Sequence, residues 1–90
     1  MASNKPLTGL VIVEIGHSVA APFAGLILSE LGAEVLKVEN PKGGDHARGW
    51  GPPFWEGTAS AFHAYNRGKK GLAVDLGNPE AVAGLRSLIL

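Results

Sequence analysis

The chain has 90 residues, of which 46% are hydrophobic and 18% charged, and its formal net charge is zero. A chain of this length forms at most one domain with a thin core, and its charge balance gives no general attraction to nucleic acid or acidic lipid. The absence of cysteine excludes disulfides and thiolate chemistry. No apolar run reaches the roughly 20 residues of a membrane span, and the polar N-terminus lacks a signal-peptide core, so we expect a cytoplasmic protein.

The first forty residues have the pattern of a strand–helix–strand unit. Residues 10–15 are a mostly β-branched apolar run, typical of a strand buried in a parallel sheet. We expect a helix near 20–31, with Ser18 as its N-cap, Pro22 in its first turn and Gly32 just beyond its end. A second strand is expected at 34–39, so the spacing predicts an α/β fold with a right-handed parallel crossover.

The second half is predicted to add one more strand and a last helix. Residues 40–57 are rich in Gly and Pro and indicate a long loop, whose Trp50, Phe54 and Trp55 we expect to pack on something. A short helix is expected near 58–65, a strand near 71–76, and a helix near 79–90 capped by Asn78. Because that helix stops on apolar residues and a three-stranded parallel sheet leaves an edge unpaired, we expect the chain to be truncated within a larger domain.

Two common kinds of site lack the residues that they need. The strand–turn–helix start evokes a dinucleotide site, but Ser18 and Ala21 stand where its fingerprint requires glycine. The histidines His17, His46 and His63 share no metal-ligand spacing, so no metal site is predicted. His17 follows the first strand, where open α/β sheets bind ligands, and a binding role and a merely structural role for it remain equally open.

Nucleophiles and phosphate-binding groups give weak signals of their own. No serine lies in a nucleophile elbow. Asp45 and Asp75 are carboxylates without a visible partner that would tune either as a nucleophile. Arg67, Lys69 and Lys70 place three cations within four residues, which indicates either a solvated turn or a phosphate clamp.

The order of several short motifs resembles the opening of the class III (CaiB/BaiF-type) coenzyme A transferase family, over residues 6–90. The motifs are Pro6–Leu10, Ala21–Phe23, Leu31–Val35, Lys37–Glu39, Gly44–Asp45, Arg48–Pro53, Asn66–Lys70, Asp75–Leu76 and Asn78–Glu80. The resemblance implies a Rossmann-like large domain, of which residues 1–90 would be the N-terminal part, and a smaller second domain. It also implies two chains interlocked as a homodimer.

The activity implied by the resemblance is the transfer of CoA between carboxylic acids through an aspartyl-anhydride intermediate. The family's nucleophilic aspartate lies beyond residue 90, so we expect no catalytic residue in this chain and no activity from it alone. Acyl-CoA and a carboxylic acid would be substrates. No permanently bound cofactor, nucleic acid or membrane partner is expected.

The resemblance also assigns CoA contacts to the ends of three strands. The expected contact residues are His17, Ser18, Val19, Ala20, Asn40, Val74, Asp75, Leu76 and Gly77, to which the basic turn adds Lys69 and Lys70. Val19 replaces a glutamine of formyl-CoA transferases, which argues against formate–oxalate specificity. Asn40 and Gly77 replace an arginine and a lysine common in the family.

Two alternative functions stay open from the sequence. An acyl-CoA racemase of the same fold shares several of these motifs, although the Arg48–Pro53 loop favours a transferase. A non-catalytic CoA- or nucleotide-binding module of 90 residues is the other alternative. The reading frame after codon 90 would separate a truncated enzyme from such a module.

Overall fold

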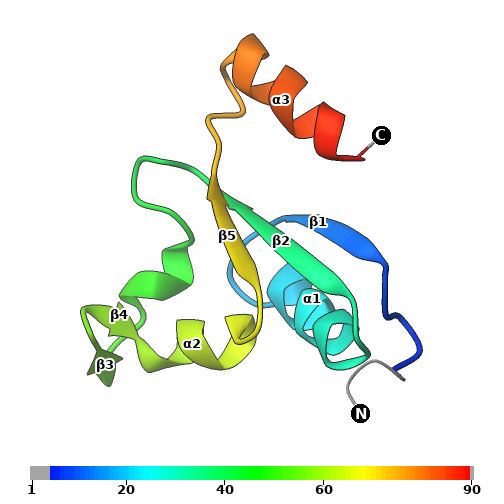
Figure 1. Ribbon diagram of the computed structural model, residues 1–90. Coiled ribbons are helices and arrows are strands. Elements are labelled where there is room, and N and C mark those ends of the chain that lie inside the picture. The colour runs from blue at the N-terminus through cyan, green and yellow to red at the C-terminus, as the bar shows by residue number, and fades with distance from the viewer. Residues whose placement is uncertain (1–4, 90) are drawn as a thin grey trace.

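A computed structural model describes residues 5–89 and has a three-stranded parallel sheet at its centre. The strand order is β1 (Val11–Ile15), β2 (Glu34–Glu39) and β5 (Lys70–Ala73) (Figure 1). Helix α1 (Ala20–Glu30) connects β1 to β2, and α2 (Ser60–Asn66) precedes β5. The α/β class and the parallel pairing expected from the sequence are confirmed.

Helix α1 ends as the sequence predicts but does not begin as it predicts. At its C-terminus Gly32 has φ 107°, and the amides of Gly32 and Ala33 donate to Ser29 O (3.0 Å) and Leu28 O (3.1 Å). This is the Schellman arrangement that a glycine permits. At the N-terminus the cap residue is Val19, without a side-chain hydrogen bond, so the expectation that Ser18 caps the helix is wrong. Ser18 has φ 70°, whereas an N-cap needs an extended backbone.

Residues 40–59 contain more structure than a loop. A 3-10 helix spans His46–Gly49, and β3 (Phe54–Trp55) pairs antiparallel with β4 (Thr58–Ala59). The expected packing of the aromatic residues is only partial, because Trp50, Phe54 and Trp55 remain 47%, 54% and 61% exposed. A hairpin with two residues in each strand is too short to bury them.

The third strand ends earlier than predicted, whereas the last helix begins where it was predicted. β5 ends at Ala73 rather than at residue 76, because the Asp75 side chain accepts the Gly77 amide and turns the chain. Helix α3 (Pro79–Ile89) is capped by the preceding Asn78, whose Oδ1 accepts the amides of Glu80 and Ala81, and the predicted cap is confirmed.

Parts of the sheet and of α3 leave apolar side chains exposed. Helix α3 stands apart from the sheet (Figure 1), and its Leu88 and Ile89 are exposed. Val11 and Ile15 of β1 are also exposed, while Glu14 between them is buried against α1. Among the described residues, no helix is long and apolar enough to cross a bilayer.

Candidate functional site

A cleft of about 580 Å³ opens at the C-terminal ends of the strands. Its walls come from the turn after β1, the first residues of α1, the segment after β2, and Leu76 after β5. A smaller hollow of about 150 Å³ shares Asn40 and Leu76 with it and extends to Gly77. We call the two together the strand-end cleft. Its lining includes His17, Ala20, Asn40, Lys42, Asp45, His46, Val74, Asp75, Leu76 and Gly77.

Most residues expected to contact CoA gather at this cleft. His17, Ala20 and Asn40 line the larger part, Leu76 lines both parts, and Val74, Asp75 and Gly77 line the smaller part. Ser18 and Val19 lie in the turn between His17 and Ala20 without lining the cleft. The arrangement follows from the fold, since parallel strands bring their carboxyl ends to one edge.

The basic turn lies at the opposite end of the strands from the cleft, so the cleft does not include Lys69 and Lys70. Lys69 precedes β5 and Lys70 is its first residue, whereas the cleft lies where the strands end. The Lys69 ammonium group donates hydrogen bonds to Pro22 O (2.9 Å) and Asn66 Oδ1 (2.7 Å) and forms an ion pair with Glu14 Oε1 (2.6 Å). Burial lowers the pKa of Lys69, and Glu14 opposes this shift. Lys70 is paired with Glu34 at 2.5 Å.

Lys42 and His46 line the cleft but were missed from the sequence. The Lys42 amide donates to Asn40 Oδ1 at 2.8 Å, which forms an Asx turn and brings Lys42 to the cleft. The Asn40-Pro41 pair was an available signal for such a turn. The rings of His46 and His17 meet edge to face with their centroids 5.0 Å apart. These side chains give the cleft cationic and aromatic groups.

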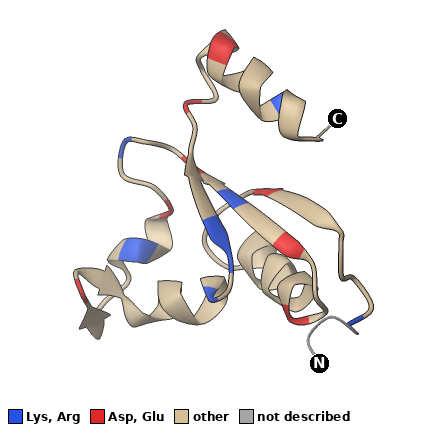
Figure 2. Ribbon diagram, in the orientation of Figure 1, with Lys and Arg blue, Asp and Glu red and all other residues tan. Residues whose placement is uncertain are grey.

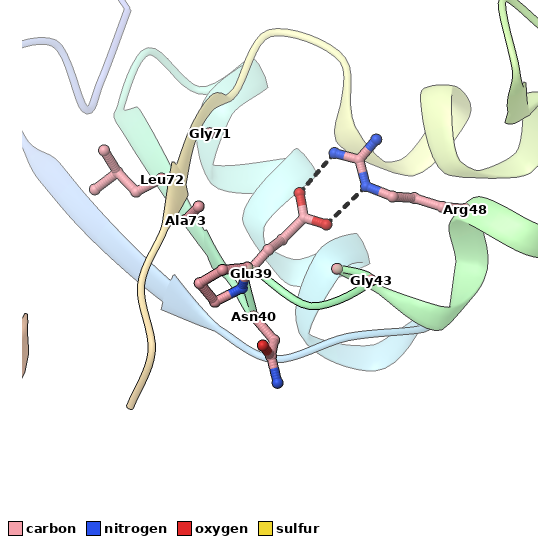
Figure 3. A pocket seen from close by; sticks show the side chains of 9 residues that line it. Glu39, Asn40, Gly43, Arg48, Gly71, Leu72 and Ala73 are labelled. Atoms are coloured by element: carbon pink, nitrogen blue, oxygen red, sulfur yellow. Dashed lines mark hydrogen bonds and ion pairs between the residues drawn. The ribbon is translucent and has the colours of Figure 1, made fainter. Parts of the chain in front are cut away.

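A second cleft of about 360 Å³ shares Glu39 and Asn40 with the strand-end cleft and also borders Arg48 (Figure 3). Its acidic group is Glu39, which accepts two hydrogen bonds of 2.7 Å from Arg48. The Arg48 hydrogen bond holds the pKa of Glu39 below its ordinary value, although burial opposes it. The same bond raises the pKa of Arg48. Glu39 is therefore neutralised by Arg48 and is not free to bind a ribose or a cation.

Asp45 is buried and has partners that the sequence did not reveal. Its Oδ1 accepts the amides of Ser18 and Ala47, each at 2.9 Å, and its Oδ2 lies 3.0 Å from Lys37 Nζ. Burial raises the pKa of Asp45, but these three contacts outweigh it and leave the pKa below its ordinary value. Both oxygens are engaged, so Asp45 is placed to hold structure rather than to attack a substrate. Within residues 5–89, no group of three or more His, Asp or Glu side chains could hold a metal ion.

Comparisons with known proteins agree on one family. The family model described as CoA-transferase family III matches residues 7–90. The chain is 46% identical to a succinate–glutarate CoA-transferase of Agrobacterium fabrum, covering 96% of this chain and 23% of that protein. It is 45% identical to the human succinyl-CoA:glutarate CoA-transferase, covering 98% and 20%. A CAIB/BAIF family protein from Brucella suis superposes with a TM-score of 0.87 at 46% identity, covering 96% and 24%.

Proposed function

Because the chain belongs to CoA-transferase family III, we propose that it is the CoA-binding, N-terminal portion of an enzyme that moves CoA between carboxylic acids. The chain spans about a quarter of the length of the relatives that it matches, so residues 1–90 would form part of a larger domain. The observation that carries the proposal is the strand-end cleft. Segments after three different strands, each assigned to CoA by the resemblance, border this one hollow.

The cleft offers suitable groups for the two chemical ends of CoA. Helix α1 begins without a side-chain cap, so its first amides are available to a phosphate. Lys42 adds a cation at the same cleft. It lies two residues after Asn40, and Asn40 stands at the position where the family often has an arginine. Apolar walls from Ala20 and Leu76 suit the adenine or the pantetheine arm.

The proposed reaction depends on residues outside this chain. Family members use an aspartate beyond position 90 to form an anhydride with the acyl group, and we assign no replacement for it within residues 5–89. The relatives from Agrobacterium, mouse and human are named for transfer between succinate or succinyl-CoA and glutarate. We therefore propose short dicarboxylic acids as acyl groups, and a transferase rather than a racemase. An interlocked homodimer and a cytoplasmic location stay predictions.

Calorimetric titration of CoA and of pantetheine into the chain tests the proposed binding site. A Lys42→Ala change should weaken CoA binding about tenfold, since a charge-assisted phosphate contact contributes about 1.5 kcal/mol or more. Pantetheine binding should not change, because pantetheine lacks the phosphates. Lys70→Ala is the matched control and should bind both ligands as the wild type does. Absence of CoA binding by the wild-type chain would contradict the proposal.

A transfer assay separates the portion from the whole enzyme. With succinyl-CoA and glutarate, the 90-residue chain should show no thioester exchange above a buffer blank, because nucleophilic catalysis needs its nucleophile. If the reading frame continues past codon 90, its complete product should catalyse the exchange. A complete product that binds CoA without transfer or racemisation would support the non-catalytic alternative instead.

A further inference from the structure

Two carboxylates and two ammonium groups form a continuous cluster of buried charges. Its members are Glu14 on β1, Lys37 on β2, Asp45 before the 3-10 helix and Lys69 before β5. Lys37 Nζ lies 3.0 Å from Glu14 Oε2 and 3.0 Å from Asp45 Oδ2. Each side chain in these pairs is 5% exposed or less. The formal charges cancel, as burial of ionised groups requires.

The cluster reaches the wall of the strand-end cleft through Asp45. Asp45 Oδ1 accepts the amide of Ser18 at 2.9 Å, and Lys37 Nζ donates to Gly16 O at 3.2 Å. Both contacts fall in the turn that presents His17 to the cleft and begins α1. Ser18 has φ 70°, a backbone conformation that residues other than Gly, Asn and Asp adopt rarely. The bond to Asp45 comes from outside the turn and helps to hold this conformation.

We propose that Asp45 is a positioning residue for CoA binding, which acts through the Ser18 amide to fix the turn 17–20. This inference rests on the function proposed above. Asp45 itself is buried, and its carboxylate makes its contacts with the protein. Its ionised oxygen accepts two amides, and bonds of this charge-assisted kind are about twice as strong as neutral ones. The turn is thereby set before the ligand arrives, which reduces the ordering cost of binding.

A pair of double variants isolates the oxygen that accepts the Ser18 amide. Lys37→Met with Asp45→Asn removes one buried charge of each sign but keeps a carbonyl oxygen at position 45. Lys37→Met with Asp45→Ala removes the same charges and also that oxygen. Replacement of a buried ion pair by uncharged groups is often tolerated, so both proteins should fold. Val35→Ala, in the fully buried core of β2, is the control for a general loss of stability.

Two readouts are made on each protein: hydrogen exchange of the Ser18 amide, and calorimetric titration with CoA. In the wild type and the Asn variant the Ser18 amide should be protected. In the Ala variant its exchange should accelerate, and the Kd for CoA should rise, each by about 10- to 100-fold. Val35→Ala should leave both readouts near wild type under conditions where it is folded.

Equal CoA affinities in the folded Asn and Ala variants would overturn the inference, as would an unprotected Ser18 amide in the wild type. Should the Ala variant not fold, the comparison of the wild type with the Asn variant decides. Protection and affinity retained in the Asn variant support the inference, and loss of both despite a folded protein overturns it. A wild-type chain that protects Ser18 but does not bind CoA would instead overturn the proposed function.

Discussion

The basic turn at residues 66–70 and the buried charge cluster show how differently charges act in one small protein. In the basic turn, Lys70 pairs with Glu34 and Arg67 with Glu30 at the surface, where the side chains are 44–71% exposed. In the cluster, Lys37 pairs with Glu14 and Asp45 out of contact with water. Figure 2 shows that basic and acidic residues occur on several elements of the fold. The buried pairs join β1 and β2 to the segments before the 3-10 helix and before β5.

The difference lies in what happens when one partner is lost. An exposed cation without its partner is solvated, so an exposed pair contributes about 0–1 kcal/mol. A buried ion that loses its partner stays uncompensated, which costs about 3–5 kcal/mol. The exposed cations of the basic turn, Arg67 and Lys70, should therefore matter little, whereas buried charges such as Glu14 and Lys69 should matter greatly.

The largest effect is expected for Asp45→Ala alone. This change leaves Lys37 with one carboxylate partner and removes the acceptor of the Ser18 and Ala47 amides. The free energy of unfolding should fall by about 3–5 kcal/mol, measured by urea denaturation. The control is Asp75→Ala, because this carboxylate is exposed and accepts a hydrogen bond from the nearby Gly77 amide. Similar losses in the two variants would contradict the contrast between buried and exposed charges.

A smaller loss is expected for Gly25→Ala in α1. A Cβ at this position would lie 2.0 Å from Glu14 Oε1 and 3.2 Å from Lys69 Nζ, so the helix or the cluster must move. Overpacking costs about 1–3 kcal/mol, which exceeds the roughly 1 kcal/mol that Ala gains over Gly in a helix. Gly84→Ala in α3 is the matched control, since a Cβ there meets nothing within 4 Å. Thermal melts should show destabilisation at Gly25 and none at Gly84.

Acid should weaken the fold through Asp45 and Glu39. Contacts in the folded state place both pKa values below the ordinary 3.8 and 4.5. The stability that these carboxylates contribute is fully present above the unfolded pKa values and is lost as the pH falls through the folded ones. Urea midpoints should therefore be flat near neutral pH and decline below about pH 4.5. Glu39→Gln should remove part of that decline, and an unchanged profile would contradict its pairing with Arg48.

The smallest effect is expected at the surface pair. Lys70→Ala should change the free energy of unfolding by no more than about 1 kcal/mol and leave CoA binding unchanged. The matched change Glu34→Gln, at the other end of the pair, should behave alike. A tenfold weaker CoA affinity in Lys70→Ala would return the basic turn to the binding site.

The sequence predicts the main elements well where the signals are local. Apolar β-branched runs predicted the strands, and Gly32 and Asn78 predicted helix ends, because each signal lies within or directly beside the element that it defines. The Ser18 cap failed because its amide binds Asp45, which lies 27 residues away. Such a contact exists only once the tertiary structure has formed.

The site residues divide in the same way. The residues after the strands could be assigned because parallel strands end at one edge, whatever their side chains. The burial of Lys69 could not be predicted, because nothing in a run of three nearby cations indicates that one of them will be buried. The pairing of Glu14 with Lys37 was partly accessible, because the two residues are direct neighbours in the parallel register. A single acid in an apolar strand opposite a single lysine is the signal that was available.

The most direct test of the central claim is to map CoA binding on the backbone amides of the chain by NMR. With CoA added, amide shifts should change at residues 17–20, at Asn40 and at residues 74–77, around the strand-end cleft. The amides of residues 66–70 should stay at their free positions. Changes confined to the basic turn, or no change at saturating CoA, would contradict the claim that this chain holds the CoA site at its strand ends.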